Sequence, residues 1–237
     1  MRRFLKSLLE LIFPRVCAVC GAQLLPQEKV ICVCCLSDLP ETRYSRLSRN
    51  PMADALNARI PGVEPYSYAC ALFFYSAQSG YGNISKGLKY HSNFRSGSFF
   101  SGMLAERLAS SPLYEDVDTV IPVPLHWTRL LRRGYNQAAV IAAEVARGLP
   151  RAQMRTDLLR RVRRTSTQTR LDNSGRSGNV KGAFRARAAG NTGNIRHILL
   201  VDDVCTTGAT LAECHSALRA IFPATVRISV ATLGYVR

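Results

Sequence analysis

The chain has 237 residues, of which 47% are hydrophobic and 20% are charged, a composition that excludes a disordered or fibrous protein. This length suffices for one well-buried domain together with a small accessory unit. The 32 basic and 16 acidic residues give a formal net charge of +16, which favours polyanionic partners such as nucleic acid, phosphorylated metabolites or a membrane surface.

The N-terminal segment predicts a short amphipathic helix. Ahead of Pro14, apolar residues recur at helical spacing: Phe4, Leu8, Leu11 and Ile12. Polar residues interrupt this stretch and no small-residue cleavage motif follows, so it does not fit a secretory signal peptide. Since no apolar run reaches the roughly 18 residues of a membrane-spanning helix, we expect a cytoplasmic protein without a transmembrane segment. The predicted helix packs on the domain or, alternatively, lies on a membrane surface.

Five of the eight cysteines lie between residues 17 and 35. They form two CxxC pairs, Cys17 with Cys20 and Cys32 with Cys35, and Cys34 lies inside the second pair. Four converging thiolates suit structural zinc, which a segment this short needs because it cannot bury a core of its own. Cys34 is an alternative ligand in the second pair. A disulfide framework and a redox-active pair are the other interpretations, and a reducing cytoplasm argues against the first.

Residues 1–40 are therefore expected to form an N-terminal helix and a zinc-binding unit, and the proline-punctuated segment 41–66 a linker. Residues 67–237 alternate predicted strands and helices, which indicates an α/β domain with a mostly parallel sheet. The strands are expected at 67–76, 118–124, 197–201 and 225–233. The helices are expected at 83–91, 96–110, 135–148 and 209–222.

The stretch HILLVDDVCTTGATL at 197–211 carries the strongest functional signal. Asp202 and Asp203 follow an apolar strand, at the end where parallel sheets bind ligands. The next residues enter a helix, so backbone amides and the helix dipole converge there, and Gly208 permits a positive φ. This combination predicts a phosphate cradle beside carboxylates that can hold sugar hydroxyls or Mg²⁺. The alternative is that the acids only cap the helix. Neither GxxxxGK[ST] nor GxGxxG is present.

This stretch resembles the phosphoribosyl pyrophosphate (PRPP) motif of type I phosphoribosyltransferases. Together with VIPVPLHWTRLLRRGYNQA at 120–138, the basic segment at 159–184, GLKYH at 87–91 and the cysteine pairs, it resembles the ComF family, whose bacterial members are linked to natural competence. The resemblance implies a phosphoribosyltransferase fold with a flexible hood, PRPP and Mg²⁺ as ligands, and Asp202 and Asp203 as catalytic residues. It assigns PRPP and phosphate binding to Val204, Cys205, Thr206, Thr207, Gly208, Ala209 and Thr210.

Two basic segments complete the expected site. The resemblance places a pyrophosphate loop after the strand at 118–124, with Arg129, Arg132, Arg133 and Gly134; guanidinium groups suit phosphate oxygens. An exposed basic helix start is the alternative. The segment 160–181 corresponds to the hood, including Arg164, Gln168, Arg176 and Asn179, although a nucleic-acid-binding tract fits its composition as well.

The function expected from the resemblance is transfer of a phosphoribosyl group from PRPP to an unidentified nitrogenous acceptor, in association with competence and DNA uptake. A non-catalytic PRPP sensor, or a nucleic-acid-associated component of the DNA-uptake machinery, is the alternative. The arginines of the pyrophosphate loop favour the enzyme, because a sensor of ribose 5-phosphate would not need them. The four histidines show no metal or catalytic-triad spacing and are expected on the surface or in the core.

Overall fold

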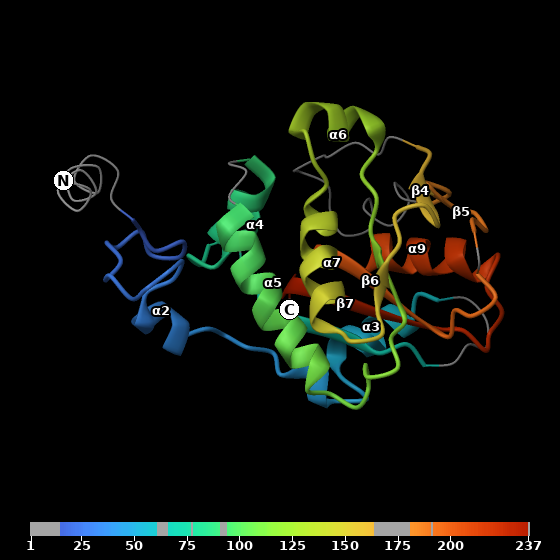
Figure 1. Cartoon of the computed structure of the whole chain (residues 1–237), viewed down its shortest axis with the longest axis horizontal. Helices are drawn as coiled ribbons and strands as arrows, with labels where there is room; N and C mark the ends of the chain where they lie inside the picture. Colours follow the sequence, from blue (N-terminus) through green and yellow to red (C-terminus); the bar gives the residue numbers. More distant parts are fainter. Residues whose placement is uncertain are drawn as a thin grey trace.

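A computed structural model of the chain describes residues 15–60, 66–76, 78–90, 94–163, 181–190 and 192–236 (Figure 1). The expected helix before Pro14 lies outside the described residues. So do the four residues expected in the hood, Arg164, Gln168, Arg176 and Asn179. The cysteine-rich segment lies at one side of the α/β core, next to α4 (Gly82–Tyr90) and α5 (Phe94–Ala109).

Five parallel strands form the central sheet in the order β1-β7-β6-β2-β3. They are β1 (Ala69–Phe74), β2 (Thr119–Pro122), β3 (Gln153–Met154), β6 (His197–Cys205) and β7 (Arg227–Tyr235). The mostly parallel α/β fold expected from the alternating pattern is confirmed. Because β6 is central and ends next to the glycine turn, the carboxyl edge of this strand positions the candidate site.

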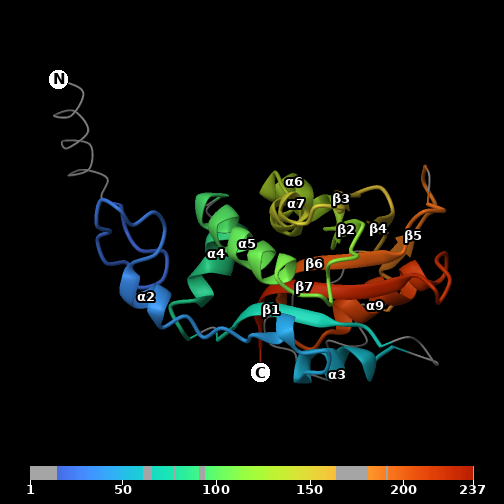
Figure 2. The same cartoon turned by 60° about the horizontal axis from the view of Figure 1, so that its bottom comes forward.

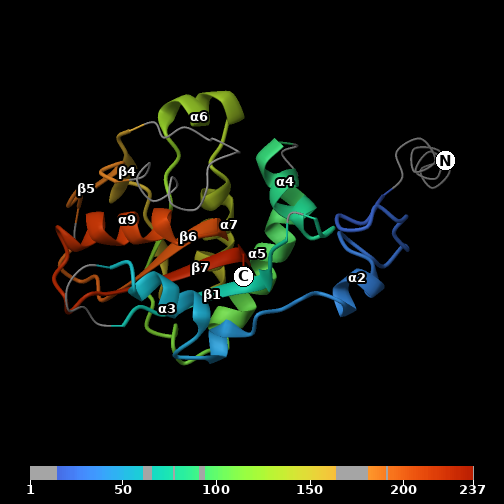
Figure 3. The ribbon, with the colours of Figure 1, turned by 180° about the vertical axis from the view of Figure 1, so that it is seen from behind.

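Helices cover both faces of the sheet, as a parallel sheet requires. In Figure 2, α5 and α7 (Gln137–Gly148) lie on one face. Figure 3 shows α3 (Pro51–Asn57) and α9 (Ala209–Arg219) on the other face. The strand residues alternate between the two cores: Ile198 and Leu200 pack in the core beneath α9, and Leu199 and Val201 in the core beneath α7.

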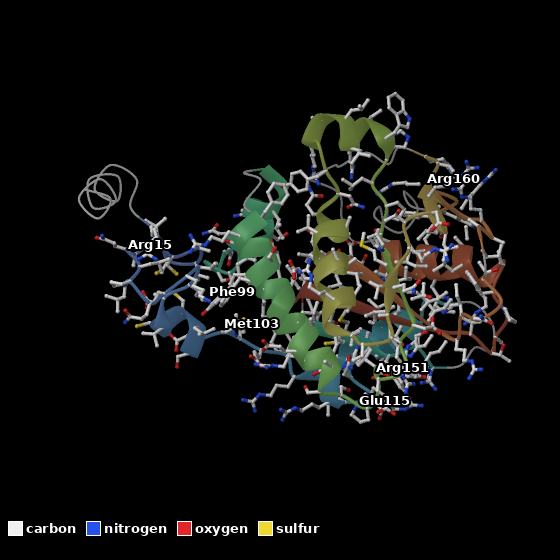
Figure 4. The ribbon with its side chains drawn as sticks, in the orientation of Figure 1. Arg15, Phe99, Met103, Glu115, Arg151 and Arg160 are labelled. Atoms are coloured by element: carbon white, nitrogen blue, oxygen red, sulfur yellow. The ribbon has the colours of Figure 1, made fainter. Side chains whose placement is uncertain are left out.

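Helix α5 carries apolar side chains on two of its faces. Phe100, Leu104 and Leu108 are fully buried in the core shared with α7. Phe99 and Met103 are half-buried and lie on the side of α5 that faces the cysteine-rich segment (Figure 4). The helix therefore supports both the sheet and the N-terminal unit.

The segment between the cysteines and the sheet packs along the edge strand β1. The amide of Thr42 donates to Leu72 O at 3.1 Å, and the amide of Phe74 donates to Pro40 O at 2.8 Å. A short 3-10 helix, η1 (Tyr44–Arg46), and then α3 follow, and Asn50 Oδ1 caps α3 by accepting from the amide of Ala53. This segment covers backbone groups that an edge strand would otherwise expose.

A small antiparallel hairpin stands apart from the main sheet. It consists of β4 (Leu159–Arg161) and β5 (Phe184–Ala186), with Arg161 paired to Phe184. Its buried residues, Leu159 and Phe184, join the core beneath α9. The hairpin is therefore held against the domain core by its own side chains.

Candidate functional site

The loop after β6 begins at the carboxyl edge of the sheet and leads directly into α9. Gly208 is the residue before the helix and has φ +74°, a backbone conformation that favours glycine. The expected use of a positive φ at this position is confirmed. Because α9 starts at Ala209, the first backbone amides of the helix and the positive end of its dipole are directed towards this turn.

The polar groups of the turn are partly free to receive a ligand. Thr207 Oγ1 accepts from the amide of Ala209 at 3.4 Å, whereas the amides of Thr206 and Thr207 have no hydrogen-bond partner in the described part of the chain. Burial raises the pKa of the Cys205 thiol to about 12, although a hydrogen bond from the Gly208 backbone opposes the shift. Cys205 is therefore a neutral core side chain, and the turn offers amides and hydroxyls rather than a nucleophile.

Asp202 and Asp203 lie within β6, because the strand continues to Cys205. Alternation along the strand directs the two side chains to opposite faces of the sheet. Asp203 is 8% exposed and accepts a hydrogen bond from Ser85 Oγ of α4 at 2.8 Å. Asp202 Oδ1 accepts from the amide of Asp203 at 2.8 Å. The expectation that both carboxylates hold one ribose therefore requires a ligand placed over the end of the strand, and it stays a prediction.

The structure brings two basic residues to this end of β6: Arg59, which local sequence patterns did not indicate, and Arg161, which belongs to the basic segment expected as the hood. A Cβ atom built on Gly208 would lie 3.9 Å from Cδ of Arg59, which follows α3 and lies far from the turn in the sequence. Burial lowers the pKa of Arg161, and the charges of Cys214 and Asp202 oppose this shift. The guanidinium group of Arg161 lies 5.0 Å above the ring of Phe184. Positive charge therefore borders the β6–α9 turn from two separate segments.

The expected pyrophosphate loop folds as a short helix, α6 (Trp127–Arg133), and Gly134 ends it with φ +78°. Arg129, Arg132 and Arg133 all belong to this helix, and Arg133 Nη1 donates to Gln137 Oε1 at 3.0 Å. The helix projects from the molecule in Figure 1. Since β2 and β6 are parallel neighbours, α6 and the β6–α9 turn follow the same edge of the sheet.

Neighbouring polar residues on α6 and α7 have structural roles. Asn136 Oδ1 caps α7 by accepting from the amide of Ala138 at 3.1 Å. His126 caps α6 in a similar way.

His197 lies in the core, where its ring nitrogens contact Asp116 at 2.6 Å and Ser229 at 2.8 Å.

The four cysteines of the two CxxC pairs converge. The sulfur atoms of Cys17, Cys20, Cys32 and Cys35 all lie within 4.8 Å of one another, and those of Cys20 and Cys32 are 3.8 Å apart. Tetrahedral zinc with Zn–S bonds of about 2.3 Å requires S···S separations of about 3.8 Å. The cluster could therefore hold a metal ion. Cys34 is exposed and is not part of it.

Backbone amides support this cluster. The amides of Val19 and Cys32 donate to the sulfur of Cys17 at 3.5 and 3.4 Å, and that of Cys35 donates to the sulfur of Cys32 at 3.4 Å. Burial raises the pKa of Cys17, but hydrogen bonds from the backbone of Cys20, Cys32 and Val19 outweigh it and lower the pKa to about 6. Burial and the neighbouring thiols raise the pKa of Cys35. The backbone hydrogen bonds thus favour the thiolate form of Cys17, which is the form that binds a metal ion.

The cysteine unit makes close contact with the core. Tyr81 Oη donates to Cys35 O at 2.8 Å, and a Cβ atom on Gly80 would lie only 2.6 Å from Val19 O. Glycine at position 80 therefore allows the two backbones to approach. Among the described residues, no helix is long and apolar enough to cross a membrane.

The fold and the site define the class: an α/β protein with a parallel sheet, a glycine turn at the end of the central strand and a four-cysteine unit consistent with a zinc ribbon. No family model matches the chain. The chain is 40% identical over 102 residues to competence protein F of Haemophilus influenzae, which is 43% of this chain and 44% of that protein. These findings support the assignment of the chain to the ComF family.

Two further relatives are both called DNA utilization protein YhgH. The one from Shigella flexneri is 38% identical over 111 residues, 47% of each chain. The one from Salmonella typhi is 36% identical over 126 residues, 53% of this chain and 52% of the relative. The matched part of the chain spans about half the length of these relatives.

Proposed function

We propose that this protein binds PRPP, with Mg²⁺, at the turn between β6 and α9. The observation that carries the proposal is the left-handed Gly208 directly before α9, in a turn where the amides of Thr206 and Thr207 have no partner in the described part of the chain. Such a helix entrance is a suitable site for a phosphate group. Arg59 beside the turn adds a second, flexible source of positive charge.

The carboxylates at the end of β6 would then hold the ribose. Asp203 is oriented by Ser85, whose hydroxyl donates to Asp203 Oδ2, and a carboxylate in this position suits a sugar hydroxyl as its donor. Asp202 interacts electrostatically with Arg161, which contributes positive charge to this end of the strand. Bound Mg²⁺ would supply charge neutralisation for the pyrophosphate. Binding the remote 5-phosphate tightly orients C1 for reaction, which is how distant binding energy assists catalysis.

We further propose transfer of the phosphoribosyl group to a nitrogenous acceptor. In this reaction the bond from C1 to the pyrophosphate oxygen breaks and a bond from C1 to the acceptor nitrogen forms, so negative charge develops on the departing pyrophosphate. Arg129, Arg132 and Arg133 of α6 are the groups assigned to that charge, because guanidinium groups pair with phosphate oxygens in a bidentate manner. No protein nucleophile is needed, in accord with the neutral, buried Cys205.

Calorimetric titration with PRPP in the presence of Mg²⁺ tests the binding. Asp203→Asn keeps the shape of the side chain and removes its charge, so we expect weaker PRPP binding with an unchanged unfolding midpoint. Asp38→Asn, at an exposed position at the end of α2 (Val33–Ser37), is the matched control. Equal PRPP affinity in the parent and in Asp203→Asn would remove the assigned role.

Pyrophosphate release separates the enzyme from a sensor. The parent protein is incubated with PRPP, Mg²⁺ and a panel of nucleobases, and release with one base identifies the acceptor class. PRPP binding without release for any nucleobase would instead favour the sensing role. The arginines of α6 support the enzyme, since they lie at the same sheet edge as the turn.

We also propose that the four-cysteine cluster holds structural zinc. With all four positions filled by protein sulfur, such an ion would stabilise the N-terminal unit and take no part in catalysis. Elemental analysis of the purified protein should return one zinc per chain. A folded, metal-free protein would contradict the proposal.

A second role, in competence and DNA uptake, is supported by the names of the relatives and by the net charge of +16. A positively charged protein that neutralises phosphates releases counterions, so its affinity for DNA falls steeply with salt. Titration of a single-stranded oligonucleotide at several salt concentrations measures this slope. Affinity that does not change with salt would argue against contact with the phosphate backbone.

A further inference from the structure

A polar cavity of about 660 Å³ lies on the edge of the molecule formed by β1, away from the β6–α9 turn. It is lined by the end of α2, the segment that follows α2, the helix η1, part of β1 and one residue of α5. Its lining residues are Leu36, Ser37, Leu39, Pro40, Glu41, Arg43, Ser45, Arg46, Cys70, Ala71, Leu72 and Arg107. The volume falls in the range of about 300–1,000 Å³ that is usual for small-ligand sites.

Arg43 and Arg46 provide two basic groups on one side of this cavity. Arg43 is the residue before η1 and Arg46 is its last residue, and the amide of Arg46 donates to Arg43 O at 3.2 Å. In a 3-10 turn, residues three apart lie one above the other. Neither side chain makes an ion pair or a hydrogen bond with the described part of the chain, so both guanidinium groups are available to a ligand.

The backbone of Arg43 is unusual. Its φ of 57° is the only positive value at a non-glycine position among the described residues. A left-handed conformation costs an ordinary residue about 1–2 kcal/mol, and such strain is concentrated at functional sites. An arginine held in this conformation at the rim of a cavity, with no protein partner in the described chain, is therefore a second indication of a ligand.

Arg107 completes the basic lining but is already neutralised. Its Nη2 donates to Glu41 Oε1 at 2.8 Å and its Nε donates to Glu41 Oε2 at 3.4 Å. Glu41 is the only acidic residue among those lining the cavity. The cavity thus carries a net charge of +2, from Arg43 and Arg46, beside a paired guanidinium group.

We propose that this cavity binds the phosphate monoester group of a small ligand, at a site separate from the β6–α9 turn. A monoester carries a charge of about −1.5 to −2 at neutral pH, which matches the two unpaired arginines, whereas a phosphodiester carries only one negative charge. Planar guanidinium groups on one face suit the three monoester oxygens. The inference does not rest on PRPP binding, because it uses none of the same residues.

Amide chemical shifts in the full-length protein, titrated with methyl phosphate and separately with dimethyl phosphate, test the site. We expect methyl phosphate to shift the amides of residues 43–46 and dimethyl phosphate to bind at least tenfold more weakly. Shifts confined to residues 206–210, or equal affinity for the two esters, would overturn the proposal. A single-stranded oligonucleotide without terminal phosphate that shifts residues 43–46 at lower concentration than methyl phosphate would overturn it too.

Variants separate binding from folding. Arg43→Gly removes the guanidinium group and relieves the backbone strain, so we expect at least tenfold weaker binding of methyl phosphate with no loss of thermal stability. Arg46→Ala should weaken binding similarly, while Arg151→Ala removes one charge from an exposed position outside the cavity and should leave binding unchanged (Figure 4). Glu41→Gln should tighten binding, since it frees Arg107. Equal affinity in Arg43→Gly, Arg46→Ala and the parent would refute the site.

Discussion

Replacing Gly208 by alanine tests whether the β6–α9 turn depends on its left-handed backbone. The nearest heavy atom to the new methyl group would be Cδ of Arg59 at 3.9 Å, which is ordinary van der Waals contact. Crowding therefore contributes little to the expected cost. The perturbation acts through φ, which is +74° at this position.

The magnitude follows from two opposing effects. A left-handed backbone costs alanine about 1–2 kcal/mol, and the smaller conformational entropy of the unfolded alanine chain returns about 0.4–1 kcal/mol. We expect Gly208→Ala to lower the free energy of unfolding by about 1 kcal/mol, which corresponds to roughly 2–4 °C in Tm for a chain of this size. If the turn relaxes and one amide no longer reaches the phosphate, PRPP affinity falls about 10- to 100-fold, the value of a charge-assisted hydrogen bond.

Gly190→Ala is the matched control. Gly190 has φ +62°, and the nearest atom to its new Cβ would be the flexible Nη2 of Arg155 at 3.6 Å, so a similar loss of stability is expected. Gly190 precedes the amino end of β6, far along the strand from the turn. Urea unfolding and calorimetry with PRPP measure the two effects in each variant. If both variants lost equal stability and equal affinity, the effect would be global and the assignment of the turn would fail.

Three further outcomes are expected. Cys20→Ser should abolish zinc retention measured by elemental analysis, while Cys34→Ser should keep one zinc per chain; the opposite pattern would contradict the ligand set. Burial, with a smaller contribution from the charge of Arg219, lowers the pKa of His215 to about 4, so up to about 3 kcal/mol of stability should be lost as the pH falls from 6.5 towards 4. His215→Leu should flatten this acid dependence in urea titrations, and an unchanged profile would refute it. Gly80→Ala should place a methyl group against Val19 O and increase protease cleavage near the cysteine unit.

Local patterns predicted much of the architecture because their physical causes are local. Apolar runs bounded by turn residues predicted β1, β6 and β7, and helical periodicity predicted α7 with Gly148 at its end. Glycine before a helix predicted the positive φ of Gly208, since few other residues adopt it. The spacing of the cysteines predicted the cluster, although only the geometry excluded Cys34.

Features that depend on tertiary contact were beyond such patterns. The short hairpin β4–β5 has too few residues to show a strand periodicity. A helix at α6 was only the alternative to a loop, because α6 carries no buried residue that would give it a helical apolar pattern. Arg59 reaches the turn from a segment almost 150 residues earlier, and no local motif marks Ser85 as the partner of Asp203. The unusual backbone of Arg43 likewise has no signal in the sequence, because arginine is not a residue that favours φ of 57°.

The extension of β6 through Cys205 has a direct consequence for the proposed site. Two adjacent acids in a loop could both turn towards one ligand, but two adjacent acids in a strand point to opposite faces. A ribose that contacts both Asp202 and Asp203 must therefore lie across the end of the strand, above the amides of the glycine turn. The two acids then have different neighbours: Asp203 accepts a hydrogen bond from Ser85 on α4, and Asp202 interacts electrostatically with Arg161. The sheet itself, rather than a flexible loop, would set the separation of the two carboxylates.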